Sequence, residues 1–174
     1  MTKHDFRLHS LDTAPEASRK DLAQVKQKFG RVPNFFAVAA ESPAAVNAYL
    51  SLSSVFQTTA LTPAEQQIVI LAASVENKCE YCVAAHSRGA KAAGVPEDVI
   101  KAITGRVPLK DPKVEALRLL VSQIVEKRAW LSDAEVQAFF SHGYSKAQLL
   151  DVMVGISMKT LSNYINHLTD PPME

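Results

Sequence analysis

Apolar residues along most of the chain recur every three or four positions, which is the spacing of one buried face of an α-helix. Leu22, Val25 and Phe29 follow this spacing, and Gly30 then provides a helix stop. No segment has the strict alternation of a half-buried strand, and no Asn-Gly or Asp-Gly pair marks a hairpin. The pattern predicts an all-α fold of roughly seven or eight helices.

Capping residues and prolines mark where these helices begin. Pro43, Pro63 and Pro112 each follow a Ser, Thr or Asp, an arrangement that is typical of a helix start. A short helix is predicted between Pro96 and Gly105. Capping boxes are predicted at Thr62–Glu65, Ser132–Glu135 and Ser145–Gln148.

The composition is that of a chain able to bury an ordinary core. Of 174 residues 47% are apolar, and 19 basic against 18 acidic side chains give a formal net charge of +1. At this length we expect one domain over residues 1–174, with its motif core at about residues 40–125. The near-zero charge argues against a nucleic-acid or membrane-surface partner.

Targeting signals are not evident in the sequence. The first twelve residues lack the apolar core of a signal peptide. The longest apolar stretch, residues 68–75, is far shorter than the roughly 20 residues of a transmembrane helix. Two cysteines are too few for the disulfide framework of a small secreted protein. These observations predict a cytoplasmic protein.

Candidate chemistry is concentrated in residues 76–87, which contain both cysteines. Cys79, Cys82 and His86 are spaced i, i+3 and i+7, so one helix face carries all three. With Asn77 as the predicted N-cap of a helix that reaches Gly94, Cys79 falls in the first turn and Cys82 in the second. The helix N-terminus and a neighbouring imidazole both favour a thiolate. A Cys-x-x-Cys pair can also cycle through a disulfide.

Other interpretations of the cysteine pair are simple core packing and zinc binding. Free cysteine is among the most buried residue types, and a Cys₂His set can bind zinc. However, the chain has no further cysteine, and its other histidines are single and widely spaced. A thioredoxin-type motif requires a βαβ setting that the helical pattern does not provide. We therefore favour a redox site with no metal and no cofactor.

The sequence around this motif is similar to that of a known family. Residues 61–87, with the signature Cys-x-x-Cys-x-x-x-His, resemble the core of the alkylhydroperoxidase D (AhpD)-like branch of the carboxymuconolactone decarboxylase family. The tail resembles the peroxidase-related members in its Asn163-Tyr164-Ile165-Asn166-His167 segment followed by Pro171-Pro172.

This resemblance implies an AhpD-like helical, oligomeric enzyme with an antioxidant role. Such an enzyme reduces organic hydroperoxides through a redox-active disulfide and takes electrons from a thiol or dithiol donor. The resemblance further implies that Cys82 is oxidised to sulfenic acid, that Cys79 is its proton donor and resolving partner, and that His86 is the base. The decarboxylase branch lacks the cysteine pair, so the pair argues against lactone decarboxylation.

Two positions depart from the pattern of the resembled proteins. The best-studied members carry a glutamate twelve residues before the first cysteine, where this chain has Gln67. Glu65 would point to another side of the helix, and Glu76 is interpreted as a solvated residue at a helix start. Tyr81 replaces a histidine that some members carry between the cysteines. Without the carboxylate His86 is less polarised, which leaves open a redox adaptor or disulfide oxidoreductase that passes electrons to a separate peroxidase.

Two predicted helices are apolar around most of their circumference. These are residues 66–75 and residues 149–165, and the pattern indicates burial on more than one side. Family members assemble through such helices. The resemblance therefore implies a homo-oligomer, a trimer or a hexamer, with the cysteine helix near a subunit boundary.

Overall fold

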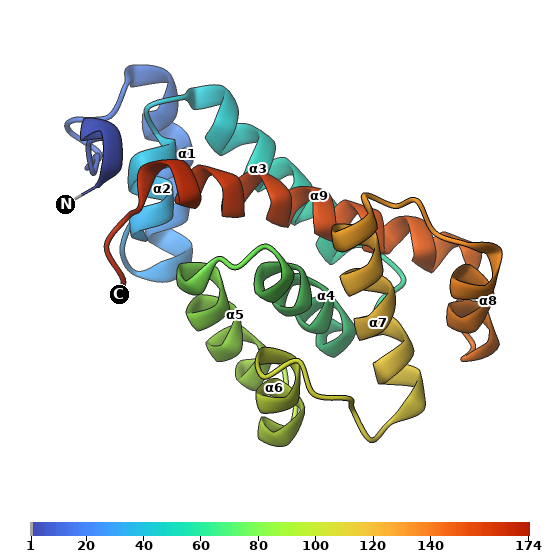
Figure 1. Ribbon diagram of the computed structural model, residues 1–174. Helices are drawn as coiled ribbons and strands as arrows, with labels where there is room; N and C mark the ends of the chain where they lie inside the picture. Colours follow the sequence, from blue (N-terminus) through green and yellow to red (C-terminus); the bar gives the residue numbers. More distant parts are fainter. Residues whose placement is uncertain (1) are drawn as a thin grey trace. The chain divides into compact units, whose positions relative to one another are not determined.

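The computed structural model describes residues 2–174, and all regular secondary structure in this range is helical (Figure 1). The all-α prediction is therefore confirmed. The elements are a short 3₁₀ helix η1 (Lys3–Asp5) and the α-helices α1 (Glu16–Phe29), α2 (Asn34–Ala39), α3 (Pro43–Gln57), α4 (Pro63–Glu76), α5 (Glu80–Ala92), α6 (Glu97–Thr104), α7 (Pro112–Lys127), α8 (Asp133–Ser141) and α9 (Lys146–Thr169).

Helix α2 is an α-helix that the sequence pattern did not predict. It has only six residues, too few to display a helical period, and it follows Pro33 without a side-chain cap. Its residues Phe35 and Phe36 are buried and pack edge-to-face against Tyr49, with ring centroids 4.8 Å and 5.4 Å away. Packing of these aromatic rings, rather than a local capping signal, holds this turn of helix.

The described chain divides into two compact units. One contains the residues up to Leu52 together with Leu161–Glu174, and the other contains Ser53–Thr160. Helices α3 and α9 each contribute residues to both units. The single domain over residues 1–174 stays a prediction.

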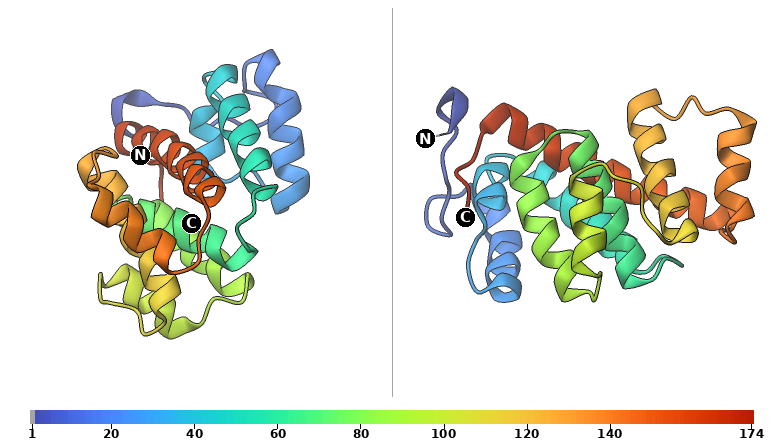
Figure 2. Two further views of the ribbon diagram at one scale, coloured as in Figure 1. Left: turned by 90° about the vertical axis from the view of Figure 1, so that its right-hand side faces the viewer. Right: turned by 60° about the horizontal axis from the view of Figure 1, so that its bottom comes forward.

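Helix α4 is the centre of the Ser53–Thr160 unit. It packs against α5, α6 and α7 (Figures 1 and 2), and Ile68, Val69, Leu71 and Ala73 are at most 3% exposed. Its burial on more than one side was predicted from its apolar pattern. Helices of the same unit supply this burial, so the apolar circumference of α4 does not by itself require a second subunit.

Helix α9 approaches the other helices of this unit closely at Gly155. A Cβ atom added at Gly155 would lie 2.7 Å from the Phe56 ring and 2.9 Å from a methyl group of Val69. Only glycine fits this crossing, because real Cβ atoms do not approach heavy atoms so closely. The crossing sets α9 tightly against Phe56 of α3 and Val69 of α4 at this point.

No helix in residues 2–174 is both long enough and apolar enough to cross a membrane.

Candidate functional site

The two cysteines lie at the junction between α4 and α5. Helix α4 ends at Glu76 with Asn77 as its C-cap, and Lys78 takes the left-handed conformation with φ of 57°. The backbone N–H groups of Lys78 and Cys79 donate to the carbonyl oxygens of Val75 and Ser74, at 3.0 Å each. This is the hydrogen-bond pattern of a Schellman motif, which ends one helix and turns the chain into the next.

The junction corrects the predicted start of the cysteine helix. Cys79, rather than Asn77, occupies the N-cap of α5, and its backbone is extended (φ −94°, ψ 91°). Cys82 is then the third helical residue and lies in the first turn instead of the second. The Schellman turn uses Asn77 to end α4, so this residue is not available to cap α5. As a result both sulfurs lie where the unpaired N–H groups of a helix start favour negative charge.

Both cysteines are thiols that form no disulfide, and both are buried inside the protein. Cys79 is 2% exposed and Cys82 is 3% exposed. Burial in apolar surroundings by itself makes a thiolate less favourable. A reactive thiolate at this place therefore needs compensating positive charge from the helix N-terminus or from a cation.

His86 lies one turn after Cys82 on α5 and is half-buried. Its Nε2 atom is 2.8 Å from Nζ of Lys159 on α9. Burial, and after it the charge of Lys159, hold the pKa of His86 well below its usual value of 6.5. The imidazole is therefore neutral at physiological pH, and its Nε2 can accept a hydrogen bond.

Lys159 is the residue of this cluster that the sequence analysis missed. Its side chain is only 1% exposed. Burial lowers its pKa from the usual 10.5, while the charges of Cys82 and Cys79 and a hydrogen bond with Cys82 act to raise it. The Nζ atom of Lys159 thus interacts with all three predicted site residues. It contacts His86, is hydrogen-bonded with Cys82 and is affected by the charge of Cys79. A signal was present in the sequence, since Lys159 directly follows the apolar positions Ile156 and Met158 of the predicted tail helix.

The three polar residues weighed as proton-relay candidates on α4 lie in different environments. Gln67 points toward α5, and its Oε1 would be 2.9 Å from a Cβ at Gly89. This oxygen is buried and has no hydrogen-bond partner among the described residues. The carboxylates of Glu65 and Glu76 interact with residues other than the two cysteines and His86.

Glu65 accepts a hydrogen bond from the Tyr144 hydroxyl at 3.0 Å and closes the capping box with Thr62. Glu76 accepts from Ser122 at 2.9 Å and pairs with Arg106 at 3.2 Å. Glu76 is thus the last residue of α4 and partly buried, so its interpretation as a solvated residue at a helix start is wrong.

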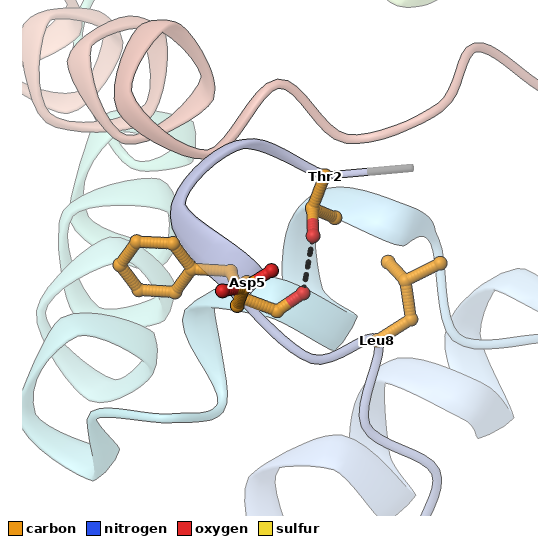
Figure 3. Close-up of a pocket in the computed structure, with 4 residues that line it drawn as sticks. Thr2, Asp5 and Leu8 are labelled. Carbon is orange, nitrogen blue, oxygen red and sulfur yellow. Dashed lines mark hydrogen bonds between the residues drawn. The ribbon is translucent and has the colours of Figure 1, made fainter.

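Among residues 2–174, no group of three or more His, Cys, Asp or Glu side chains is arranged to hold a metal ion. A hollow of about 330 Å³ is lined by Thr2, Asp5, Phe6 and Leu8 of the N-terminal segment (Figure 3). The hydroxyl of Thr2 donates to the Phe6 carbonyl there. This hollow contains none of the cysteine-cluster residues.

Comparisons with known proteins agree with the sequence resemblance. Residues 40–123 match the model of the carboxymuconolactone decarboxylase family. A search of curated proteins found no match.

Solved structures share the fold at low sequence identity. An uncharacterized peroxidase-related protein with an alkylhydroperoxidase AhpD core, from Ralstonia eutropha JMP134, is 20% identical with a TM-score of 0.86, covering 99% of this chain and 92% of its own. An uncharacterized peroxidase-related protein from Silicibacter sp. TM1040 is 20% identical with a TM-score of 0.81, covering 100% and 95%. The debrominase Bmp8, solved in complex with 2,3,4-tribromopyrrole, is 16% identical with a TM-score of 0.80, covering 99% and 92%.

The Cys-x-x-Cys-x-x-x-His segment lies inside the matched range, at the N-cap and in the first two turns of α5. The chain therefore has the AhpD-like helical fold, and its residues 40–123 match the carboxymuconolactone decarboxylase family model.

Proposed function

We propose that this protein is a thiol-dependent peroxidase that reduces organic hydroperoxides through a disulfide cycle between Cys79 and Cys82. The observation that carries the proposal is the pair of buried thiols at the N-terminus of α5, of which Cys82 is hydrogen-bonded to a buried lysine. Inert packing would not require a buried cation against the sulfurs, because burying an ammonium group is costly without a charged partner. A site that stabilises thiolate suits peroxide chemistry.

The first step oxidises Cys82. Its thiolate attacks the distal oxygen of the hydroperoxide, an S–O bond forms, and the O–O bond breaks. Cys82 becomes a sulfenic acid, and the alkoxide that leaves takes up a proton to become an alcohol. His86 takes part in this proton transfer through its contact with Lys159.

The second step closes the disulfide. The sulfur of Cys79 attacks the sulfur of Cys82, an S–S bond forms, and hydroxide leaves as water with the proton that Cys79 gives up. An external thiol or dithiol then reduces the disulfide and returns both cysteines to the thiol form. The net reaction converts hydroperoxide and dithiol into alcohol, water and the oxidised donor.

The comparisons support an enzyme of this general kind. The family and the similar folds include peroxidase-related proteins and a debrominase. The cysteine pair at the start of α5 favours the thiol peroxidase among these activities, with an antioxidant role.

A redox adaptor that passes electrons to a separate peroxidase is the second candidate. The amide of Gln67, in place of a carboxylate, is the observation that favours it, because the proton relay of the resembled proteins is then incomplete. Such an adaptor would reduce a partner disulfide without consuming peroxide.

Steady-state turnover separates these functions. Reduced protein is mixed with cumene hydroperoxide and dithiothreitol, and the loss of hydroperoxide is measured. We expect turnover in the wild type and in the control Ala85→Ser, which adds a hydroxyl to the same helix outside the cluster. We expect none in the double variant Cys79→Ser/Cys82→Ser. Turnover that persists in the double variant would refute the site, and wild-type reduction of a protein disulfide without peroxide loss would support the adaptor.

A further inference from the structure

We propose that Lys159 is a third catalytic residue, which holds Cys82 as a thiolate and gives the proton that the alkoxide takes when the O–O bond breaks. This inference rests on the proposed peroxidase function for its second half. Its first half, the stabilisation of the thiolate, concerns the resting protein and is testable without peroxide.

The placement of Lys159 on α9 shows that its burial is built into the helix. Val152, Gly155 and Lys159 are spaced i, i+3 and i+7, and all three are buried, so the lysine lies on the inward face of α9. Gly155 sets that face tightly against Phe56 and Val69. Lysine side chains usually keep their charged end in water. Lys159 is only 1% exposed, so its ammonium group must interact with groups inside the protein.

The contacts of its nitrogen assign that role. Nζ lies 2.8 Å from Nε2 of His86, and it forms a hydrogen bond with Cys82. An ammonium group has donors only. It can therefore donate one hydrogen to a neutral imidazole and another to the sulfur at the same time.

These contacts also limit what His86 does. Because Nε2 accepts from Lys159, the ring hydrogen of the neutral histidine is on Nδ1. Nε2 is then occupied and cannot take the Cys82 proton while Lys159 holds it. His86 thus acts through Lys159, by positioning the ammonium group against the sulfur.

The charges around Lys159 favour an ammonium–thiolate pair. The groups of α5 that act on it are Cys82, Cys79 and His86, and the first two become anionic when they lose a proton. A buried ammonium next to a buried thiolate neutralises two charges that would each be costly alone. Burial also lowers the pKa of Lys159, which makes its ammonium a stronger acid than that of an exposed lysine.

The proton balance of the reaction follows from this pair. In the resting site Cys82 is a thiolate and Lys159 is an ammonium. When the sulfur takes the distal oxygen and is oxidised, the peroxide is reduced to an alkoxide, which takes a proton from Lys159 and leaves as the alcohol. Lys159 is then a neutral amine. Once the dithiol donor has reduced the disulfide, the amine takes the proton of the new Cys82 thiol and restores the pair.

Alkylation measures the thiolate half. In a Cys79→Ser background only Cys82 reacts with iodoacetamide, and the pH dependence of the rate reports its pKa. We expect Lys159→Met to raise that pKa and to slow alkylation at pH 7 by about ten-fold or more, because one pKa unit changes the thiolate fraction ten-fold. Lys91→Met removes an exposed lysine from α5 and is the matched control, with no change expected. His86→Asn should shift the pKa less than Lys159→Met.

Peroxide consumption per thiolate measures the proton-donor half. At pH 7, after each rate is divided by the thiolate fraction that the alkylation titration gives for Cys82, we expect Lys159→Met to react with cumene hydroperoxide about ten-fold more slowly than the wild type. Melting temperatures establish that the variants are folded, and Lys159→Gln replaces Lys159→Met if the latter is not.

An unchanged Cys82 pKa in the folded lysine variant would overturn the inference, and so would a larger shift in His86→Asn. Equal rates per thiolate at pH 7 would overturn the proton-donor half. A raised pKa in a protein whose wild type does not consume peroxide would contradict the proposed function and leave the thiolate half standing.

Discussion

Gln67 places an amide oxygen in a buried position that faces α5 without a hydrogen-bond donor. In the sequence resemblance, the best-studied members carry a glutamate at this position. A carboxylate in the same environment would have neither a hydrogen-bond partner nor full hydration, which costs free energy. The site is therefore built around an uncharged residue at position 67.

We predict that Gln67→Glu lowers the free energy of unfolding at pH 7 by about 1–3 kcal/mol. Burial raises the pKa of the new carboxyl in the folded state, so the folded protein binds its proton more readily than the unfolded chain. The loss should therefore be largest at neutral pH and shrink as the pH falls toward 4. Urea unfolding at several pH values measures this.

The apolar variant Gln67→Met has a similar size and removes the unpartnered oxygen, so its stability should be unchanged or higher. An equal loss of stability in both variants would contradict the electrostatic explanation. A clear gain of peroxide turnover in Gln67→Glu would instead indicate that the missing carboxylate limits the enzyme.

At the scale of the elements, the crossing of α9 over α3 and α4 depends on Gly155. We predict that Gly155→Ala lowers the free energy of unfolding by about 1–3 kcal/mol, because the added methyl group meets the Phe56 ring and Val69 in a packed core. Thermal melts or urea unfolding measure the change.

Gly89→Ala on α5 is the matched control for this crossing. There the added methyl group meets the end of the Gln67 side chain, which can move, and alanine has a higher helix propensity than glycine by about 1 kcal/mol. We expect no loss of stability. Similar losses at both glycines would show that the crossing is not specially tight.

The start of α4 is held by Glu65, and this predicts a pH dependence. Burial raises the pKa of Glu65, but hydrogen bonds from Thr62 and Tyr144 and the charge of Lys113 outweigh it, so the pKa lies below the usual 4.5. A carboxyl whose folded pKa is lowered adds stability above its unfolded pKa and loses it as the pH falls through the folded pKa.

Glu65→Gln should therefore lower the free energy of unfolding by about 1–2 kcal/mol at pH 7, and by less below pH 4.5. Urea unfolding at both pH values measures the difference. Glu126→Gln, on the exposed surface of α7, is the control and should have little effect at either pH. A constant difference between wild type and Glu65→Gln across this range would contradict the account.

Local signals predicted the helix starts well, and tertiary contacts account for what was missed. The capping boxes at Thr62 and Ser132 form as predicted. A capping box depends only on side-chain and backbone groups three residues apart, so the local sequence is enough to predict it. The Asn77 prediction was wrong because a Schellman turn places a lysine in the left-handed conformation, where the sequence has no glycine to mark it. Lys159 is 77 residues from Cys82 in the sequence, so only the fold connects them.

For the whole molecule, assembly stays a prediction. The burial of α4 is supplied by α5, α6 and α7 of the same chain. Apolar surface that this chain leaves uncovered is found instead on α7 and α9, where Leu119 is 41% exposed and Leu150 is 67% exposed.

Light scattering at micromolar concentration measures the mass of the particle. We expect a trimer or a hexamer, and a stable mass near the 19.0 kDa of one chain would contradict this prediction.

The central claim is that Cys82 attacks the hydroperoxide and Cys79 resolves it, and a single turnover tests this most directly. Reduced wild type, Cys79→Ser and Cys82→Ser are each treated with one equivalent of cumene hydroperoxide and a sulfenic-acid trap, and the products are mapped by mass spectrometry. We predict a Cys79–Cys82 disulfide in the wild type, a trapped adduct on Cys82 in Cys79→Ser, and no adduct in Cys82→Ser. An adduct that forms only in Cys82→Ser would reverse the roles, and unchanged thiols with intact hydroperoxide in all three proteins would contradict the account.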